Sequence, residues 1–409
     1  MTDRTTLDTS PSPASSSRRG AVAGAMFLMA TSAIGPGFIT QTTVFTARLG
    51  AAFAFAIVVS VLVDIAIQLN VWRVVGVSGR RAQDLGNRVV PGGGYALAAL
   101  DVFGGLVFNI GNIAGTALGL NALLGLDVKA GGALSALAAI AIFLSRRAGV
   151  AMDRIVVVLG AVMIVMTLYV AIVSGPPLGD ALREGVAPGE VDLLVITTLI
   201  GGTVGGYITY AGAHRMIESG VTGPGRVAEI NRAAVTGVLV TGLMRVLLFL
   251  AVLGVVAGGV RLAEDNPAPS AFEHVSGEAG LRVFGLIMWS AAITSVIGAS
   301  YTSVSFLVSF APWVERHRGR LVVAFIAVSA VIYLAIGTTP AKLLVLAGAL
   351  NGLILPFGLA VLLWAAARRR DLLGGYRYPA WLLGIGIAAW LLSLYLGWNA
   401  LSGLDDLWK

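Results

Sequence analysis

The chain has 409 residues, of which 57% are hydrophobic and only 12% are charged, with a formal net charge of +7. Soluble domains are about twice as rich in charged residues, whereas this chain repeats apolar runs of about 20 residues, the length that a bilayer requires. Its composition therefore predicts a polytopic membrane protein in contact with a lipid bilayer. No nucleic-acid partner is expected because the basic residues fall in short clusters between apolar runs, and the absence of cysteine excludes disulfides and thiolate ligands.

Eleven apolar segments are expected to form eleven transmembrane helices. They are 21–48, 52–76, 93–122, 130–146, 152–173, 193–214, 233–259, 282–310, 321–337, 341–366 and 380–402. Residues 1–19 are rich in Ser, Thr and Pro and are expected to form a disordered cytoplasmic tail. Residues 20–409 are expected to form one transmembrane transporter domain, with helices 1–5 at 20–173, helices 6–10 at 193–366 and helix 11 at 380–402.

The connections between these segments predict the orientation of the chain. With the N-terminus inside, most arginines fall on the same side as the tail, whereas the opposite connections are rich in acidic residues. Cytoplasmic loops carry an excess of Lys and Arg. We therefore expect a multi-pass protein of a bacterial-type cytoplasmic (inner) membrane, with its N-terminus inside and its C-terminus outside.

Two apolar segments cannot be continuous helices. The first contains Gly35-Pro-Gly-Phe38 and the sixth contains Gly201-Gly-Thr-Val-Gly-Gly-Tyr207. Pro36 lacks an N–H and clashes with the preceding turn, and glycine lowers helix propensity, so the backbone opens. Five segments precede the loop at 174–192 and five follow it before a last one. This layout predicts an all-α integral membrane protein with a LeuT-type 5+5 inverted repeat and broken helices 1 and 6, in which the solute binds between the breaks.

The opened backbone and its polar neighbours are the candidate solute-binding groups. They are Gly35, Gly37, Phe38, Thr40, Gln41, Asn109, Asn112, Gly205, Gly206, Tyr207 and Thr209. Valine at Gly37 or Gly206 is expected to block the solute and leave the fold largely intact. Asp64 and Arg245 lie deep within apolar segments and are candidates for ion coupling, whereas Asp101 and Arg73 lie nearer to helix ends, where pairing or snorkelling explains them.

Five short motifs, in this order and spacing, resemble those of the Nramp superfamily over nearly the whole chain. They are Gly35-Pro-Gly-Phe38, Gly201-Gly-Thr-Val204, Val283-Phe-Gly-Leu286, Pro340-Ala-Lys-Leu-Leu-Val-Leu346 and Leu355-Pro-Phe-Gly358. The resemblance implies a LeuT-type secondary transporter, and most members move divalent metals with protons. The chain is a divergent member by this comparison because the metal-binding motif is missing.

The departures fall on the metal and proton sites of the family. The family's Asp-Pro-Gly-Asn motif has Gly35 and Phe38 at its two ligand positions. Its Met-Pro-His motif falls on Gly205-Gly206-Tyr207, and its acidic pair on the third helix falls on Asn109 and Asn112. No metal site and no cofactor are therefore expected.

Three functions are compatible with these residues. The first is secondary active transport of a small organic carboxylate or amide, as a symporter coupled to H⁺ or Na⁺. Resemblance to a bacterial subgroup that accompanies 5-oxoproline breakdown makes a 5-oxoproline-like solute the first candidate. The alternative is transport of a divalent metal ion of the Mg/Mn type, held by backbone carbonyls and amides. The third is a non-transporting membrane sensor. An enzyme is not expected, because three histidines, two of them in loops, leave no catalytic constellation.

Overall fold

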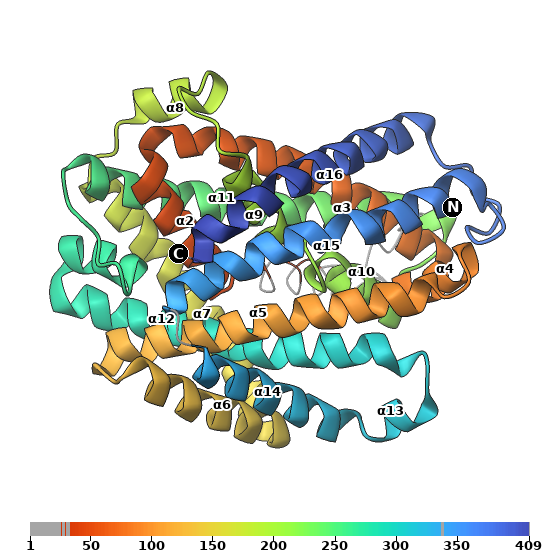
Figure 1. Cartoon of the computed structure of the whole chain (residues 1–409), viewed down its shortest axis with the longest axis horizontal. Helices are drawn as coiled ribbons and strands as arrows, with labels where there is room; N and C mark the ends of the chain where they lie inside the picture. The colour runs from red at the N-terminus through yellow and green to blue at the C-terminus, as the bar shows by residue number, and fades with distance from the viewer. Residues whose placement is uncertain (1–25, 27–28, 30–32, 337–338, 409) are drawn as a thin grey trace, which may run out of the picture.

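The computed structural model describes residues 26, 29, 33–336 and 339–408, and for 146–157 and 400–408 it describes the backbone alone. The expected tail at 1–19 lies outside these residues. Every regular element within the described part is helical (Figure 1). The α-helices are α2 (Pro36–Leu49), α3 (Phe53–Ser78), α4 (Ala82–Val89), α5 (Gly93–Leu124), α6 (Val128–Leu144), α7 (Arg146–Val173), α8 (Leu178–Val186), α9 (Leu193–Val204), α10 (Ile208–Glu218), α11 (Val227–Ala257), α12 (Pro267–Val308), α13 (Pro312–Arg316), α14 (Arg318–Ala335), α15 (Pro340–Arg368) and α16 (Ala380–Trp408). Two short 3₁₀ helices, η1 (Gly50–Ala52) and η2 (Pro224–Arg226), precede α3 and α11.

Within the described residues, each expected apolar segment coincides with a helix, except that the sixth is divided into α9 and α10 and the first is described mainly as α2. By length and hydropathy, however, eight helices of the described residues can cross a membrane, or nine if the bent pair α7 and α8 is one span. This count is lower than the eleven expected helices for two reasons. Helices α2 and α3 are joined through a single 3₁₀ turn and count as one stretch, and α6 has only 17 residues. The number of eleven spans remains a prediction.

Both expected interruptions are present. Ile34 and Gly35 are not helical, and α2 begins at Pro36, where the missing N–H breaks no hydrogen bond. In the sixth segment α9 ends at Val204 and α10 begins at Ile208. Gly206 lies between them with φ +54°, a left-handed conformation that favours glycine. Local sequence therefore determines where both helices open.

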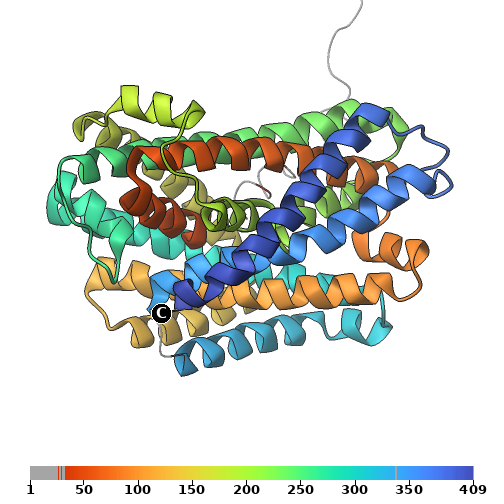
Figure 2. The same ribbon diagram turned by 45° about the horizontal axis from the view of Figure 1, so that its top comes forward.

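The two halves pack around these interruptions. Helix α5 lies against α12 and α15, and α11 lies against α2 and α3 (Figures 1 and 2). Helices α9 and α15 approach most closely at Gly201, where a Cβ atom would lie 2.7 Å from the Cα atom of Gly352. Helices in a bilayer gain stability from such close packing of small residues because the surrounding lipid is as apolar as their side chains.

The short helices and loops lie at two opposite ends of the molecule. Helix α8 and the end of α16 lie at one end, whereas α4, α13 and the loop at 369–379 lie at the other (Figures 1 and 2). The second end carries most of the basic connections that we expect to face the cytoplasm.

Cysteine labelling tests this orientation. Asp180 in α8 and Arg370 in the opposite loop are both exposed, and the chain has no native cysteine. In intact cells, Asp180→Cys is expected to react with a membrane-impermeant maleimide, whereas Arg370→Cys is expected to react only after the membrane is permeabilised. The reverse pattern would show that the chain is inserted the other way round.

Candidate functional site

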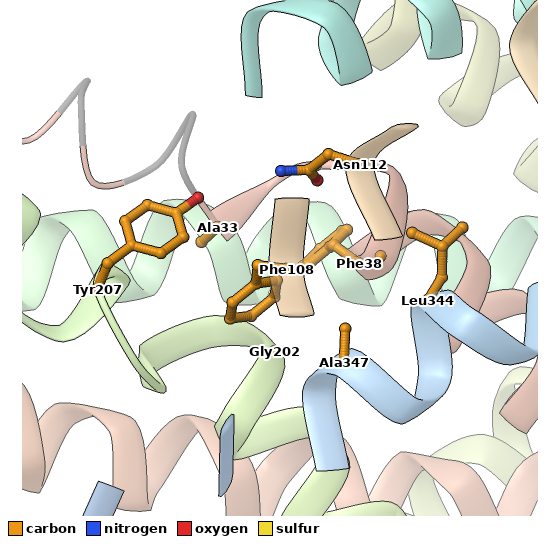
Figure 3. Close-up of a pocket in the computed structure, with 10 residues that line it drawn as sticks. Ala33, Phe38, Phe108, Asn112, Gly202, Tyr207, Leu344 and Ala347 are labelled. Carbon is orange, nitrogen blue, oxygen red and sulfur yellow. The ribbon is translucent and has the colours of Figure 1, made fainter. Parts of the chain in front are cut away.

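A small cavity lies between the two interrupted helices (Figure 3). Its lining residues are Ala33, Gly35, Gly37, Phe38, Phe108, Asn112, Gly202, Tyr207, Leu344 and Ala347. These residues come from both breaks and from α5 and α15, so four parts of the chain that are distant in sequence meet here. The cavity has a volume of about 10 Å³, which is room for about one water molecule.

The first break contributes the N-terminal end of α2. Gly35 has extended backbone angles, and the first hydrogen bond across this end runs from the Ile39 N–H to the Gly35 carbonyl, at 3.2 Å. The first N–H groups of a helix lack partners within the helix and carry a partial positive charge. Because Gly37 and Phe38 occupy this first turn and line the cavity, the cavity wall favours an anionic or hydrogen-bond-accepting group.

The second break contributes the Tyr207 side chain. Figure 3 shows the Tyr207 ring and the Asn112 amide on either side of Phe108, and the Phe108 and Tyr207 rings meet edge to face with centroids 5.7 Å apart. Tyr210 lies elsewhere, against His214 and Phe306. The second break therefore presents one tyrosine to the cavity.

Gly206 supports the second break and does not line the cavity. Its φ is positive, and the Oδ1 atom of Asn351 occupies the place where a Cβ atom would lie. The expectation that valine at Gly206 leaves the fold intact is therefore wrong: any side chain there strains the backbone and displaces Asn351. At Gly37, in contrast, a Cβ atom would make only ordinary contacts, at 3.6 Å from Gln41 Nε2.

Five of the eleven predicted site residues line the cavity: Gly35, Gly37, Phe38, Asn112 and Tyr207. The other six do not: Thr40, Gln41, Asn109, Gly205, Gly206 and Thr209. Thr209 donates its hydroxyl to the Val204 carbonyl at the end of α9, and Gln41 Nε2 donates to the Leu344 carbonyl at 3.0 Å. These two side chains hold the half-helices in place.

The two asparagines of α5 point in different directions. Asn109 Nδ2 donates to Ser300 Oγ in α12 and to Ser329 Oγ in α14, both at 3.0 Å. Asn112 lines the cavity, and its Nδ2 is buried without a hydrogen-bond partner among the described residues. Of the pair, Asn112 is the one that lines the cavity.

Five lining residues were not predicted: Ala33, Phe108, Gly202, Leu344 and Ala347. Phe108 precedes Asn112 by one helical turn, so helical spacing alone could have placed both on one face. Leu344 and Ala347 belong to α15, about 300 residues beyond the first break. No local pattern indicates that they reach the cavity.

Arg245 of α11 touches both interrupted helices. Its Nη2 donates to Thr203 Oγ1 at 2.9 Å, and its Cζ lies 4.3 Å from the centroid of the Phe38 ring. No salt bridge joins Arg245 to Asp64 in α3 among the described residues, where Arg245 Nη1 and Asp64 Oδ1 are both buried without a hydrogen-bond partner. The cavity wall is therefore backed by a buried cation.

Two further ionisable groups are more buried than their expected positions near helix ends suggested. Asp101 in α5 is 1% exposed, and its Oδ2 has no hydrogen-bond partner in the part of the chain that the structure describes. Arg73 in α3 is 5% exposed, donates to Asn231 Oδ1 at 3.1 Å and lies 6.0 Å from the Tyr378 ring centroid. Neither residue lines the cavity.

The cavity does not fit a transition metal. Its lining has no carboxylate, imidazole or thioether group, which are the side chains that bind such ions. Across the residues that the structure describes, no group of three or more His, Asp or Glu side chains is arranged to hold a metal ion. The polar groups at the cavity are backbone N–H groups, the Asn112 amide and the Tyr207 hydroxyl.

Comparison with known proteins gives the family of the chain. A family model described as Natural resistance-associated macrophage protein-like, Nramp, matches residues 26–402. The chain is 49% identical over 387 residues to the uncharacterized membrane protein YcsG of Bacillus subtilis (strain 168). The match covers 94% of this chain and 95% of that protein.

Two solved structures share its fold. The manganese transporter of Eremococcus coleocola, in complex with an aromatic bis-isothiourea substituted compound, matches with a TM-score of 0.73 at 17% identity over 98% of this chain and 90% of that one. MhsT in complex with L-phenylalanine matches with a TM-score of 0.67 at 16% identity, over 92% of this chain and 98% of that one. The LeuT-type architecture that the sequence predicted is thereby confirmed, and its neighbours are transporters, not enzymes. The chain is a multi-pass membrane protein that belongs to the Nramp family.

Proposed function

We propose that the chain is a secondary active transporter that moves a small organic solute, bearing a carboxylate or an amide, across the cytoplasmic membrane by alternating access. One observation carries the proposal: the cavity that both broken helices border has no carboxylate, imidazole or thioether in its lining, which includes the start of α2, three aromatic residues and the Asn112 amide. A 5-oxoproline-like solute, with one carboxylate and one ring amide, has groups to match these donors and acceptors.

The architecture that the chain shares with MhsT is compatible with an organic solute. MhsT was solved with L-phenylalanine, so this architecture accommodates a carboxylate-bearing molecule, and at 16% identity the likeness shows only the fold. Half-helix N-termini at the middle of the membrane favour such anionic groups. Asp64 and Arg245 are candidates for coupling solute movement to H⁺ or Na⁺, since ionisable groups buried in transmembrane helices are commonly functional.

Divalent-metal transport is the alternative because a manganese transporter shares the fold. At 17% identity the likeness shows only the fold. Divalent ions in proteins take several oxygen, nitrogen or sulfur ligands, usually with negative charge among them. The described lining of this cavity offers no negative side chain, and the cation of Arg245 contacts its wall at Phe38.

Proteoliposomes containing the full chain test the proposal. We expect saturable uptake of radiolabelled 5-oxoproline above the level of empty liposomes, and manganese influx, followed with a metal-sensitive dye, that matches empty liposomes. Asn112→Leu is expected to reduce the organic uptake at least tenfold, because it removes the unpartnered amide from the cavity. Saturable manganese influx that Asn112→Leu abolishes would favour the metal transporter, and binding without uptake would favour a sensor.

A further inference from the structure

Arg245 places one positive charge against the residues that adjoin both helix breaks. It is 2% exposed, and its guanidinium bonds to Thr203, two residues before Gly205, and stacks on Phe38, three residues after Gly35. Phe38 is also a wall of the cavity. The guanidinium therefore contacts a residue of the cavity wall.

The hydrogen-bonding capacity of Arg245 is only partly used. Its Nη1 is buried and has no hydrogen-bond partner within the described residues, and the same is true of Asp64 Oδ1. A charged donor buried without a partner is far less favourable than one that is paired. One NH₂ group of the buried guanidinium therefore has no acceptor among the described residues. The same guanidinium contacts Phe38, which lines the cavity in the first turn of α2.

We propose that Arg245 recognises the carboxylate of the transported solute, which makes the substrate class a small organic anion. This assignment rests on the proposed function. Rotation of the Phe38 side chain as the solute enters brings Nη1 to the cavity, where it donates to the carboxylate together with the free N–H groups of the first turn of α2. Guanidinium is suited to this role because it stays charged when buried and binds carboxylates in a fixed planar geometry.

Asp64 in α3 tests whether these buried groups have a structural role alone. Within the described residues, Asp64 Oδ1 and Arg245 Nη1 both lack a hydrogen-bond partner. If the two groups had a structural role alone, Asp64→Asn and Arg245→Gln would have the same effect on solute affinity. If Arg245 recognises the solute, Arg245→Gln lowers the affinity for an anion, whereas Asp64→Asn keeps or raises it.

Isothermal titration with a matched pair of probes tests the proposal. The probes are 5-oxoproline and its neutral carboxamide, which differ only in the carboxylate. The purified full-length protein is expected to bind the acid at least tenfold more tightly than the amide. Arg245→Gln is expected to abolish that preference, and Arg245→Lys to reduce it, because lysine keeps the charge and loses the planar fork.

Arg73→Gln is the matched control. Arg73 is also buried and also combines one hydrogen bond with an aromatic neighbour, but it lies away from both breaks. It is expected to keep the tenfold preference, and Asp64→Asn is expected to keep or increase it.

Three results would overturn the inference. In the first, Arg245→Gln and Arg245→Lys keep the preference for the acid over the amide. In the second, both variants lower the affinity for the two probes by the same factor. In the third, Asp64→Asn erases the preference. In each of these cases wild-type uptake of 5-oxoproline would leave the proposed function standing. Wild-type protein that binds neither probe would overturn both.

Discussion

Replacing Gly201 with valine is expected to lower the free energy of unfolding by about 3 kcal/mol, because the new side chain collides with backbone and not with a flexible side chain. The Cβ atom alone would lie 2.7 Å from Gly352 Cα and closer still to the Gly348 carbonyl oxygen. Neither helix can yield without moving as a whole, so α9 is pushed away from α15. The half-helix that ends at the second break would then lose its support.

Thermal unfolding of the detergent-solubilised protein measures this effect. Gly298→Val in α12 is the control, since a Cβ atom at Gly298 would meet no atom within 4 Å. We expect a fall of several degrees in the melting temperature for Gly201→Val and a change of no more than a degree or two for Gly298→Val. Equal melting temperatures for the two variants would show that α9 and α15 are not in close contact.

Valine at Gly37 is expected to abolish solute binding while the protein stays folded. Gly37 lines the cavity, and a Cβ atom there fits at 3.6 Å from Gln41 Nε2 and 3.8 Å from the Leu344 carbonyl oxygen. Because Gly37 lines the cavity, the two methyl groups beyond that Cβ atom take up space beside the wall that the solute needs when the cavity opens. A loss of at least tenfold in affinity for 5-oxoproline is expected by titration, with little change in melting temperature.

Gly206→Val makes the contrast with Gly37→Val informative. It is expected to lose binding and stability together, because valine is strained at a positive φ and displaces the Asn351 amide. If Gly37→Val binds the solute as well as the wild-type protein does, the solute site lies outside this cavity.

The two breaks could be predicted because their causes are local. Pro36 has no N–H to donate wherever the chain folds, and a run of glycines weakens any helix. The long apolar segments are predictable for the same reason, since their length and composition match a bilayer. The fold of the chain was therefore accessible from the order of these features and the resemblance to a known superfamily.

The orientation of single side chains could not be predicted because it depends on how each helix is rotated. Asn109 and Asn112 are three residues apart, about 60° around the helix, which is enough to turn one toward Ser300 and the other into the cavity. Thr209 follows an opened backbone, and only the rotation of α10 decides that its hydroxyl meets the Val204 carbonyl. Leu344 reaches the site through tertiary packing alone.

The small volume of the cavity has a consequence for measured affinities. A ring-containing solute is much larger than the single water molecule that fits, so the conformation described here cannot be the one that binds it. When only a fraction of the molecules is open, the apparent dissociation constant equals the intrinsic constant divided by that fraction. An open fraction of about 1% weakens the apparent affinity about 100-fold. A substitution that merely favours the open form would then tighten binding without adding any contact to the solute.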